Sequence, residues 1–133
     1  MQVQQHHFSA VGLLITHYNR SQSLERLLNA FATLHCSFNE IIVSDDGSKP
    51  EHLAYIKDLQ HSFNFKLVTA EVNSGLGNNI NKGQDAVNSP LTLYVQEDFE
   101  PSTEFPDHFA DAVDFMQQRN ELDIIRFYAY FKY

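Results

Sequence analysis

The feature that most constrains this chain is a regular alternation between short apolar runs and longer amphipathic stretches. Apolar runs of strand length lie at 10–16, 40–44, 65–70 and 91–95, and an aromatic-rich run lies at 124–131. Between them, apolar residues recur every three or four positions, which is typical of helices with one buried face. This alternation predicts parallel strands joined by right-handed helical crossovers. We therefore expect an α/β fold, with a mostly parallel sheet of about five strands and helices on both faces.

Local signals place the ends of the expected helices. The first helix follows from the spacing of apolar residues over 24–34. The second is expected to start at Ser48, because Ser48 and Glu51 have the spacing of a capping box. The glycine- and asparagine-rich segment 73–83 leads into a third helix, and a fourth is expected around 109–116, after a proline. On the third helix, Leu76, Ile80 and Val87 are expected to lie on one helical stripe.

Composition and charge exclude several classes of protein. The 133 residues suffice for a single domain, expected to span 1–133. The formal net charge of −8 argues against nucleic acid as a partner, although backbone N–H groups and a divalent cation can still hold a nucleotide's phosphates. The single cysteine, Cys36, allows no intrachain disulfide and no cysteine zinc site, and is expected to be a packed thiol. No signal peptide or membrane-length apolar run is visible, so we expect a cytoplasmic protein, with a location at the inner face of the membrane left open for a longer form.

Polar clusters follow three of the expected strands directly. In open α/β sheets, ligands bind beyond the carboxyl ends of the strands, so these clusters are expected to meet at one crevice. Each cluster alone also fits ordinary turn chemistry. Together, however, they would crowd four carboxylates that repel one another unless a cation or hydrogen-bond donors compensate. The clusters are Thr16, Tyr18 and Asn19 after the first strand, Asp45 and Asp46 after the second, and Glu97 and Asp98 after the fourth.

These residue types suit a nucleotide bound with a metal ion. Paired carboxylate oxygens are ligands that Mg2+ or Mn2+ accepts while it also carries phosphate oxygens. A carboxylate such as that of Asp46 can accept a hydrogen bond from the imide N–H of a base. A tyrosine such as Tyr18 can stack on the base ring.

The order of the motifs resembles the family 2 glycosyltransferases. The resemblance is carried by L-L-I-T-H-Y-N-R, E-I-I-V-S-D-D-G-S, N-S-G-L-G-N-N-I-N-K-G and L-Y-V-Q-E-D-F-E-P, and it covers the chain from about Val11 onward. Each motif is weak alone, but four in this order are fairly specific. The resemblance implies a GT-A, Rossmann-like fold that binds a nucleoside-diphosphate sugar, with a UDP-sugar as the first expectation, and a divalent cation, Mg2+ or Mn2+.

The resemblance also implies roles for individual residues. Thr16, Tyr18 and Asn19 would belong to the nucleoside pocket, and Asp46, with Asp45 beside it, would bind the base. The segment 73–83 would pass the diphosphate, with Gly75 and Asn81 among the nucleotide-binding residues. Asp98 would hold the metal, with Glu97 in the middle of the acidic motif. Two positions depart from the family pattern: Gln96 stands where the acidic motif usually begins with Asp, and Ile80 stands where Arg often precedes Asn.

Transfer in this family implies an acceptor hydroxyl, on a saccharide or a lipid-linked saccharide, that attacks the anomeric carbon with inversion. The general base and the acceptor surface are expected beyond Tyr133, so no catalytic residue is assigned within the chain, and residues 1–133 alone are expected to be inactive. The aromatic strand at 124–131 would then be partly uncovered, which predicts self-association through it.

Three alternatives remain at this point. A catalytically degenerate module could bind a nucleotide sugar or serve regulation, which Gln96 and Ile80 would favour. A dinucleotide oxidoreductase is disfavoured because Ile80 stands where the fingerprint of Gly75 and Gly77 requires a third glycine. A phosphorylated receiver is disfavoured because the third strand ends near Glu71 and Asn73, without an accepting aspartate.

Overall fold

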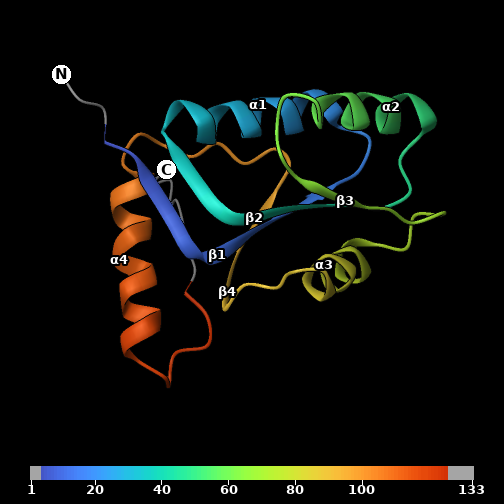
Figure 1. The fold of residues 1–133 in the computed structure, drawn as a ribbon. Coiled ribbons are helices and arrows are strands. Elements are labelled where there is room, and N and C mark those ends of the chain that lie inside the picture. Colours follow the sequence, from blue (N-terminus) through green and yellow to red (C-terminus); the bar gives the residue numbers. More distant parts are fainter. Residues whose placement is uncertain (1–3, 126–133) are drawn as a thin grey trace, which may run out of the picture. The chain divides into compact units, whose positions relative to one another are not determined.

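The structure is a computed structural model that describes residues 4–125. Strands and helices alternate from the first strand to the last helix, as the sequence predicts (Figure 1). In chain order they are β1 (His6–His17), α1 (Ser21–Thr33), β2 (Cys36–Asp45), α2 (Pro50–Leu59), β3 (Lys66–Val68), α3 (Leu76–Asp85), β4 (Leu91–Gln96) and α4 (Phe105–Gln118).

The strands form one parallel sheet in the order β3-β2-β1-β4. This confirms the α/β class and the parallel sheet. Four strands are present among residues 4–125, against the expected five or so. Ile124 and Ile125, at the start of the expected fifth strand, belong to no strand, and the rest of that range lies outside the described residues.

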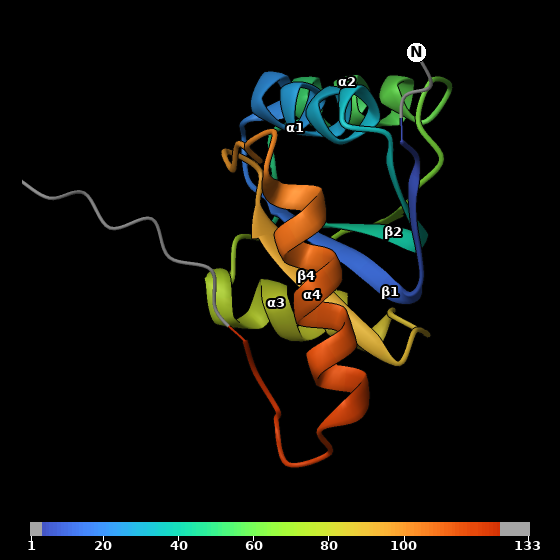
Figure 2. The ribbon, with the colours of Figure 1, turned by 90° about the vertical axis from the view of Figure 1, so that its left-hand side faces the viewer.

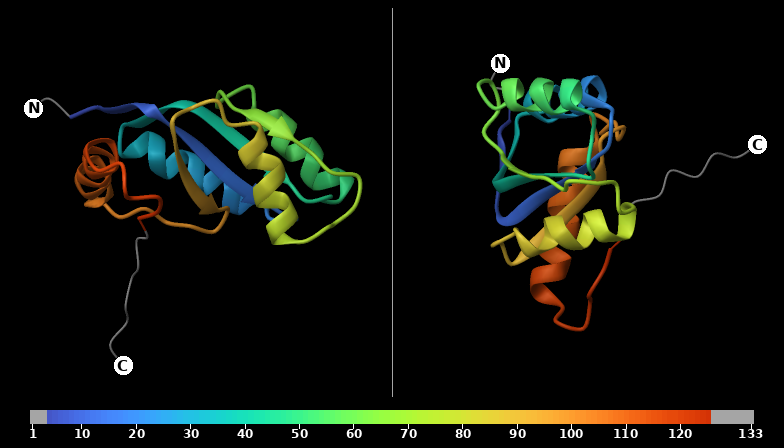
Figure 3. Two further views of the ribbon diagram at one scale, coloured as in Figure 1. Left: turned by 90° about the horizontal axis from the view of Figure 1, so that it is seen from below. Right: turned by 90° about the vertical axis from the view of Figure 1, so that its right-hand side faces the viewer.

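The chain reverses its direction across the sheet once, and this reversal places the helices. From β1 it steps to β2 and then to β3, with α1 and α2 as the crossovers, and it then returns past β1 to form β4 through α3. Because parallel crossovers are right-handed, a step in the opposite direction puts its helix on the opposite face. Figures 1, 2 and 3 show α1 and α2 on one face of the sheet and α3 on the other.

Burial on both faces explains why the central strands are apolar without alternation. In β1, Val11 and the run from Leu13 to Ile15 are at most 1% exposed, and in β2 so are Ile42 and Val43. A sheet covered on both sides favours such continuous runs. The face covered by α1 packs against a stripe of buried side chains on that helix: Leu24, Leu27, Leu28 and Phe31.

The start of α2 differs from the sequence expectation, whereas Cys36 is buried as expected. The capping-box prediction is wrong: α2 starts after Lys49, with Pro50 in its first turn, and has no side-chain cap. Ser48 is instead buried, with its hydroxyl group in the site described below. Cys36 is the packed thiol that was expected; it opens β2, and burial raises the pKa of its thiol to about 11.

The chain divides into two compact units, Met1–Pro101 and Ser102–Tyr133. The first contains the whole sheet with α1, α2 and α3. The described part of the second contains α4, where the rings of Phe105 and Phe109 stack with centroids 5.2 Å apart. The expectation of a single domain over 1–133 stays a prediction. Within residues 4–125, the helices are too short or too polar to cross a bilayer.

Candidate functional site at the carboxyl edge of the sheet

The carboxyl ends of β1, β2 and β4 meet at one edge of the sheet. Thr16 in β1 is level with Ser44 in β2 and with Gln96 in β4. Backbone hydrogen bonds extend this pairing past the strands, because the Asp46 N–H donates to the His17 carbonyl at 3.0 Å and the Glu97 N–H donates to the Thr16 carbonyl at 3.1 Å. The predicted convergence of the three polar clusters on one edge is therefore confirmed. This edge flanks the place where strand order reverses, which is where open α/β sheets bind ligands.

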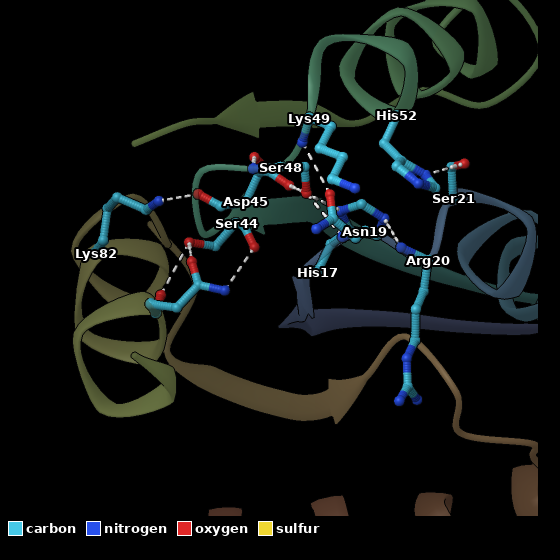
Figure 4. Close-up of polar contacts among 11 residues, drawn as sticks. His17, Asn19, Arg20, Ser21, Ser44, Asp45, Ser48, Lys49, His52 and Lys82 are labelled. Atoms are coloured by element: carbon cyan, nitrogen blue, oxygen red, sulfur yellow. Dashed lines mark hydrogen bonds and ion pairs between the residues drawn. The ribbon is translucent and has the colours of Figure 1, made fainter. Parts of the chain in front are cut away.

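His17 is the residue of this edge that sequence reasoning missed. It is fully buried, and its Nδ1 atom lies 2.7 Å from Asp45 Oδ1. The backbone N–H of Arg20 donates to His17 Nε2 at 3.1 Å, which makes Nε2 an acceptor. A neutral imidazole has one donor and one acceptor nitrogen, so Nδ1 carries the hydrogen and donates it to Asp45 (Figure 4).

Asp45 is the centre of a satisfied, buried network. Besides the contact with His17, its carboxylate accepts the Ser48 N–H at 2.9 Å and the Ser48 hydroxyl at 2.5 Å. Burial acts to raise the pKa of Asp45, but the hydrogen bonds from His17 and Ser48 outweigh it and hold the pKa below its ordinary value. Asp45 is thus an ionised carboxylate whose bonds fix the two loops in place.

Asn19 joins the loop after β1 to the loop after β2. Its backbone N–H donates to Ser48 Oγ at 2.9 Å, and its side-chain Oδ1 accepts the Lys49 N–H at 2.8 Å. Asn19 has a φ of 51°, a left-handed conformation that asparagine tolerates better than most residues. These contacts, drawn in Figure 4, show why the Ser48 hydroxyl does not cap α2: it is already committed to Asp45 and Asn19.

Two further residues after β1 lie differently. Thr16 is buried, and its hydroxyl is 2.9 Å from the hydroxyl of Tyr94 in β4. Tyr18 is 42% exposed, so its ring is accessible to a ligand. Both lie at the predicted edge, Thr16 inside the sheet and Tyr18 at its surface.

Asp46 organises the glycine-containing segment before α3. Its two carboxylate oxygens accept the N–H groups of Ser74, at 2.8 Å, and Gly75, at 3.0 Å. The following Gly47 has a φ of +75°, and a Cβ there would lie 2.5 Å from the carbonyl carbon of Val72, so only glycine fits this turn. Asp46 itself is 4% exposed.

The third helix docks on the sheet through small and polar residues. Asn79 and Gly83 are its buried positions, and the Asn79 amide exchanges hydrogen bonds with Ser44 at 2.7 and 3.0 Å. The predicted stripe is wrong, because Leu76 is 47% exposed and Val87 lies past the end of the helix. Asn81 is exposed.

Lys82, also on α3, reaches back to the sheet. Its Nζ donates to the Asp45 carbonyl (Figure 4). Partial burial lowers the pKa of this lysine, although the nearby carboxylates of Asp45 and Asp46 act in the opposite direction. The side chain therefore places a cation at the carboxyl end of β2.

The acidic pair after β4 is less buried than the pair after β2. The Asp98 side chain is 53% exposed, and its Oδ2 lies 3.3 Å from the Arg20 guanidinium. Burial raises the pKa of the neighbouring Glu97; the Asp98 charge acts in the same direction, and the Arg20 charge acts against it. No group of three or more histidine, cysteine or acidic residues within 4–125 is arranged to hold a metal ion. A cation here would need ligands from a bound phosphate or from water.

Comparisons with known proteins agree with this architecture. The family model described as Glycosyl transferase family 2 matches residues 13–132. A poly-beta-1,6-N-acetyl-D-glucosamine synthase from Staphylococcus epidermidis is 33% identical over 73 residues, which is 55% of this chain and 18% of that protein. This chain thus spans about a fifth of the length of the curated relative.

Solved structures give the same result. Residues 1–349 of TarS from S. aureus, in complex with UDP-GlcNAc, superpose with a TM-score of 0.64 at 25% identity over 83% of this chain and 32% of that one. A mannosyltransferase from Pyrobaculum calidifontis, PcManGT, in complex with GDP-Man and Mn2+, superposes with a TM-score of 0.66 at 16% identity over 80% of this chain and 32% of that one. With the family match over nearly its whole length, this chain belongs to glycosyl transferase family 2 and has the GT-A fold of its structural neighbours.

Proposed function

We propose that this chain is the donor-binding part of an inverting glycosyltransferase and that it holds a UDP-sugar at the carboxyl edge of β1, β2 and β4. The observation that supports this most directly is the convergence of three polar loops on that edge, set by the register of Thr16 with Ser44 and Gln96. The TarS structure contains UDP-GlcNAc, which favours UDP among nucleotide donors for a chain 25% identical to it.

In this proposal the nucleoside lies against the loops after β1 and β2. Tyr18 supplies an exposed ring for stacking, beside Thr16 and Asn19. Asp46, with Asp45 beneath it, faces the imide of the base. The Asp46 oxygens already accept two N–H groups, and each has a further lone pair for a third donor. Gly75 and Asn81 flank the diphosphate.

A divalent cation, Mg2+ or Mn2+, fits the acidic pair after β4. Asp98 offers an accessible carboxylate whose one described side-chain partner, Arg20, is itself more than half exposed. Glu97 stands beside it. Because residues 4–125 present no complete set of protein ligands, oxygens of the diphosphate and water would fill the remaining positions. When bound, the cation would neutralise charge that develops on the departing diphosphate.

The reaction completes with groups outside this edge. An acceptor hydroxyl, on a saccharide or a lipid-linked saccharide, attacks the anomeric carbon while a carboxylate base removes its proton. We place that base and the acceptor surface beyond Tyr133. The similarity to a poly-N-acetylglucosamine synthase favours polysaccharide biosynthesis, on the cytoplasmic side and, for a longer protein, at the inner face of the membrane.

Calorimetric titration with UDP, with and without Mn2+, tests the assignment. Asp46→Ala should weaken UDP binding whether or not metal is present, because it removes a contact to the base. Asp98→Ala should abolish the enhancement of UDP binding by metal. Each lost charged hydrogen bond should cost about 1.5–3 kcal/mol of binding free energy. Equal affinities for the wild type and both variants would refute these roles.

A second candidate function is binding of the nucleotide sugar without catalytic transfer of the sugar. A catalytically degenerate module would bind the nucleotide sugar for regulation, and Gln96 and Ile80, which depart from the family pattern, are the observations in its favour. Steady-state transfer by the full-length protein separates the two proposals, since a degenerate module would bind UDP-sugar without forming product.

A further inference from the structure

Arg20 connects the loop after β1 to the acidic loop after β4. Its guanidinium Nη1 lies 3.3 Å from Asp98 Oδ2, and the two residues are 78 positions apart in the chain. The side chains are 59% and 53% exposed, so solvent and ions reach both. The carboxylate that the proposed function assigns to the metal is therefore held by a positive side chain in the structure.

The backbone of Arg20 is anchored by hydrogen bonds, whereas its side chain is exposed. Its N–H donates to the buried His17 ring, and its carbonyl accepts the Leu24 N–H at 3.1 Å at the start of α1. The His17 ring is in turn held by Asp45. Figure 4 shows the guanidinium extending away from this anchored backbone. Only rotation about side-chain bonds is needed for the guanidinium to leave Asp98.

We propose that Arg20 is a built-in counter-ion of Asp98 that a divalent cation displaces, and that the released guanidinium then binds phosphate oxygens of the donor. This inference rests on the proposed function, because it takes Asp98 as a metal ligand. A guanidinium and a divalent cation cannot share one exposed carboxylate without mutual repulsion. The negative charge of a diphosphate attracts both the guanidinium and the divalent cation. Metal and nucleotide should therefore bind cooperatively.

The cations near this edge divide their roles in a way that favours Arg20 for phosphate. Lys82 is partly buried, and its ammonium group donates to the Asp45 carbonyl. Ile80 offers no charge at the position before Asn81. The exposed guanidinium of Arg20 has donors in a planar fork that matches phosphate geometry. It also starts within contact distance of the carboxylate proposed to hold the metal.

The test is a pair of titrations on the full chain with Arg20→Met. Mn2+ binding without nucleotide, measured from the electron paramagnetic resonance signal of free Mn2+, should tighten about two- to fivefold, because an exposed ion pair competes only modestly. UDP binding at saturating Mn2+ should weaken by about tenfold, since a charged hydrogen bond to phosphate is lost. Opposite effects on metal and nucleotide would not arise from a merely structural role.

Two controls separate this inference from charge effects and from the proposed function. Arg26→Met removes the same charge from the exposed side of α1, where the side chain of Arg26 donates to Ser23 Oγ at 3.1 Å, and it should change neither affinity. Arg20→Lys keeps the charge and should restore most of the competition with Mn2+. Asp98→Asn should weaken Mn2+ binding, which tests the metal site independently of Arg20.

The outcomes are distinguishable. If Asp98→Asn weakens Mn2+ binding but Arg20→Met leaves it unchanged, the exchange is overturned and the metal site stands. If neither variant alters Mn2+ binding, or if no variant binds Mn2+, both the exchange at Arg20 and the metal site at Asp98 are overturned. If Arg20→Met does not fold, the NMR signal of the Nε–Hε group of Arg20 in the wild-type protein tests the exchange instead. It should shift during a Mg2+ titration in parallel with metal binding, and an unmoved signal overturns the exchange.

Discussion

At the scale of single residues, Asp45 is the side chain on which this edge most depends. It is fully buried, and it accepts hydrogen bonds from His17 and from both donors of Ser48. In Asp45→Asn, the amide nitrogen must face one of these donors, so at least one buried contact becomes donor against donor. We expect a loss of about 1.5–3 kcal/mol in the free energy of unfolding at pH 7, measured by urea denaturation.

The same substitution has a defined pH dependence. The pKa of Asp45 is lower in the folded protein than in the unfolded chain, where it is about 3.9. The carboxylate's contribution is therefore complete above the unfolded pKa and is lost as the pH falls through the lower, folded value. The difference in unfolding free energy between wild type and Asp45→Asn should shrink below about pH 3.9. Asp85→Asn, at an exposed position in the last turn of α3, is the matched surface substitution for comparison.

Sequence reasoning found most of these residues but not how they are bonded. The carboxylates were placed at the right edge because a strand end fixes where the following residue lies. His17 was given no role, because its buried hydrogen bond is to Asp45, 28 positions away in the chain. Ser48 was read as a helix cap from its local spacing, but tertiary partners, Asp45 and Asn19, take its hydroxyl. A local sequence pattern cannot indicate that tertiary partners compete with the helix N-terminus for the Ser48 hydroxyl.

At the scale of elements, the docking of α3 depends on the absence of a side chain at Gly83. A Cβ there would lie 2.4 Å from Leu14 Cδ1 and 2.9 Å from Ser44 Cβ. Gly83→Ala should therefore push the helix off the sheet and lower the free energy of unfolding by about 1–3 kcal/mol. The matched control is Gly77→Ala in the same helix, where a Cβ would have open space. This substitution should raise the free energy of unfolding by up to about 1 kcal/mol. Equal effects of the two substitutions in chemical denaturation would contradict this account.

The strands could be predicted from sequence far better than this helix. Continuous apolar runs mark strands that are covered on both faces, and β1, β2 and β4 lie where such runs occur. For α3, the sequence pattern placed Leu76, Ile80 and Val87 on one helical stripe, and apolar periodicity is the usual signal of a buried face. It docks instead through Asn79 and Gly83, which allow close approach and side-chain hydrogen bonds to Ser44. Hydrophobic patterning carries no signal for such an interface.

At the scale of the whole molecule, the proposed donor site belongs to one unit. The three strand ends, the segment before α3 and the Arg20–Asp98 pair all lie within Met1–Pro101. The family match runs on to residue 132, and the superposed part is 32% of the TarS chain. The proposed donor-binding residues thus lie together in one unit, apart from the additional residues that the longer relatives contain. Self-association through the aromatic segment stays a prediction, since residues 126–133 lie outside the described part.

The last prediction is that residues 1–133 bind a UDP-sugar but do not transfer it repeatedly to an acceptor. At the described edge, Asp45 is enclosed by His17 and Ser48, Asp46 holds two backbone N–H groups, and Asp98 is assigned to the metal. A general base must reach the acceptor hydroxyl, and its absence typically costs about a hundred- to ten-thousand-fold in rate. Loss of acceptor positioning adds a larger penalty. Product formation should be measured with a saccharide acceptor under saturating donor and Mn2+. Rapid multiple turnover by residues 1–133 would show that the base lies within this chain.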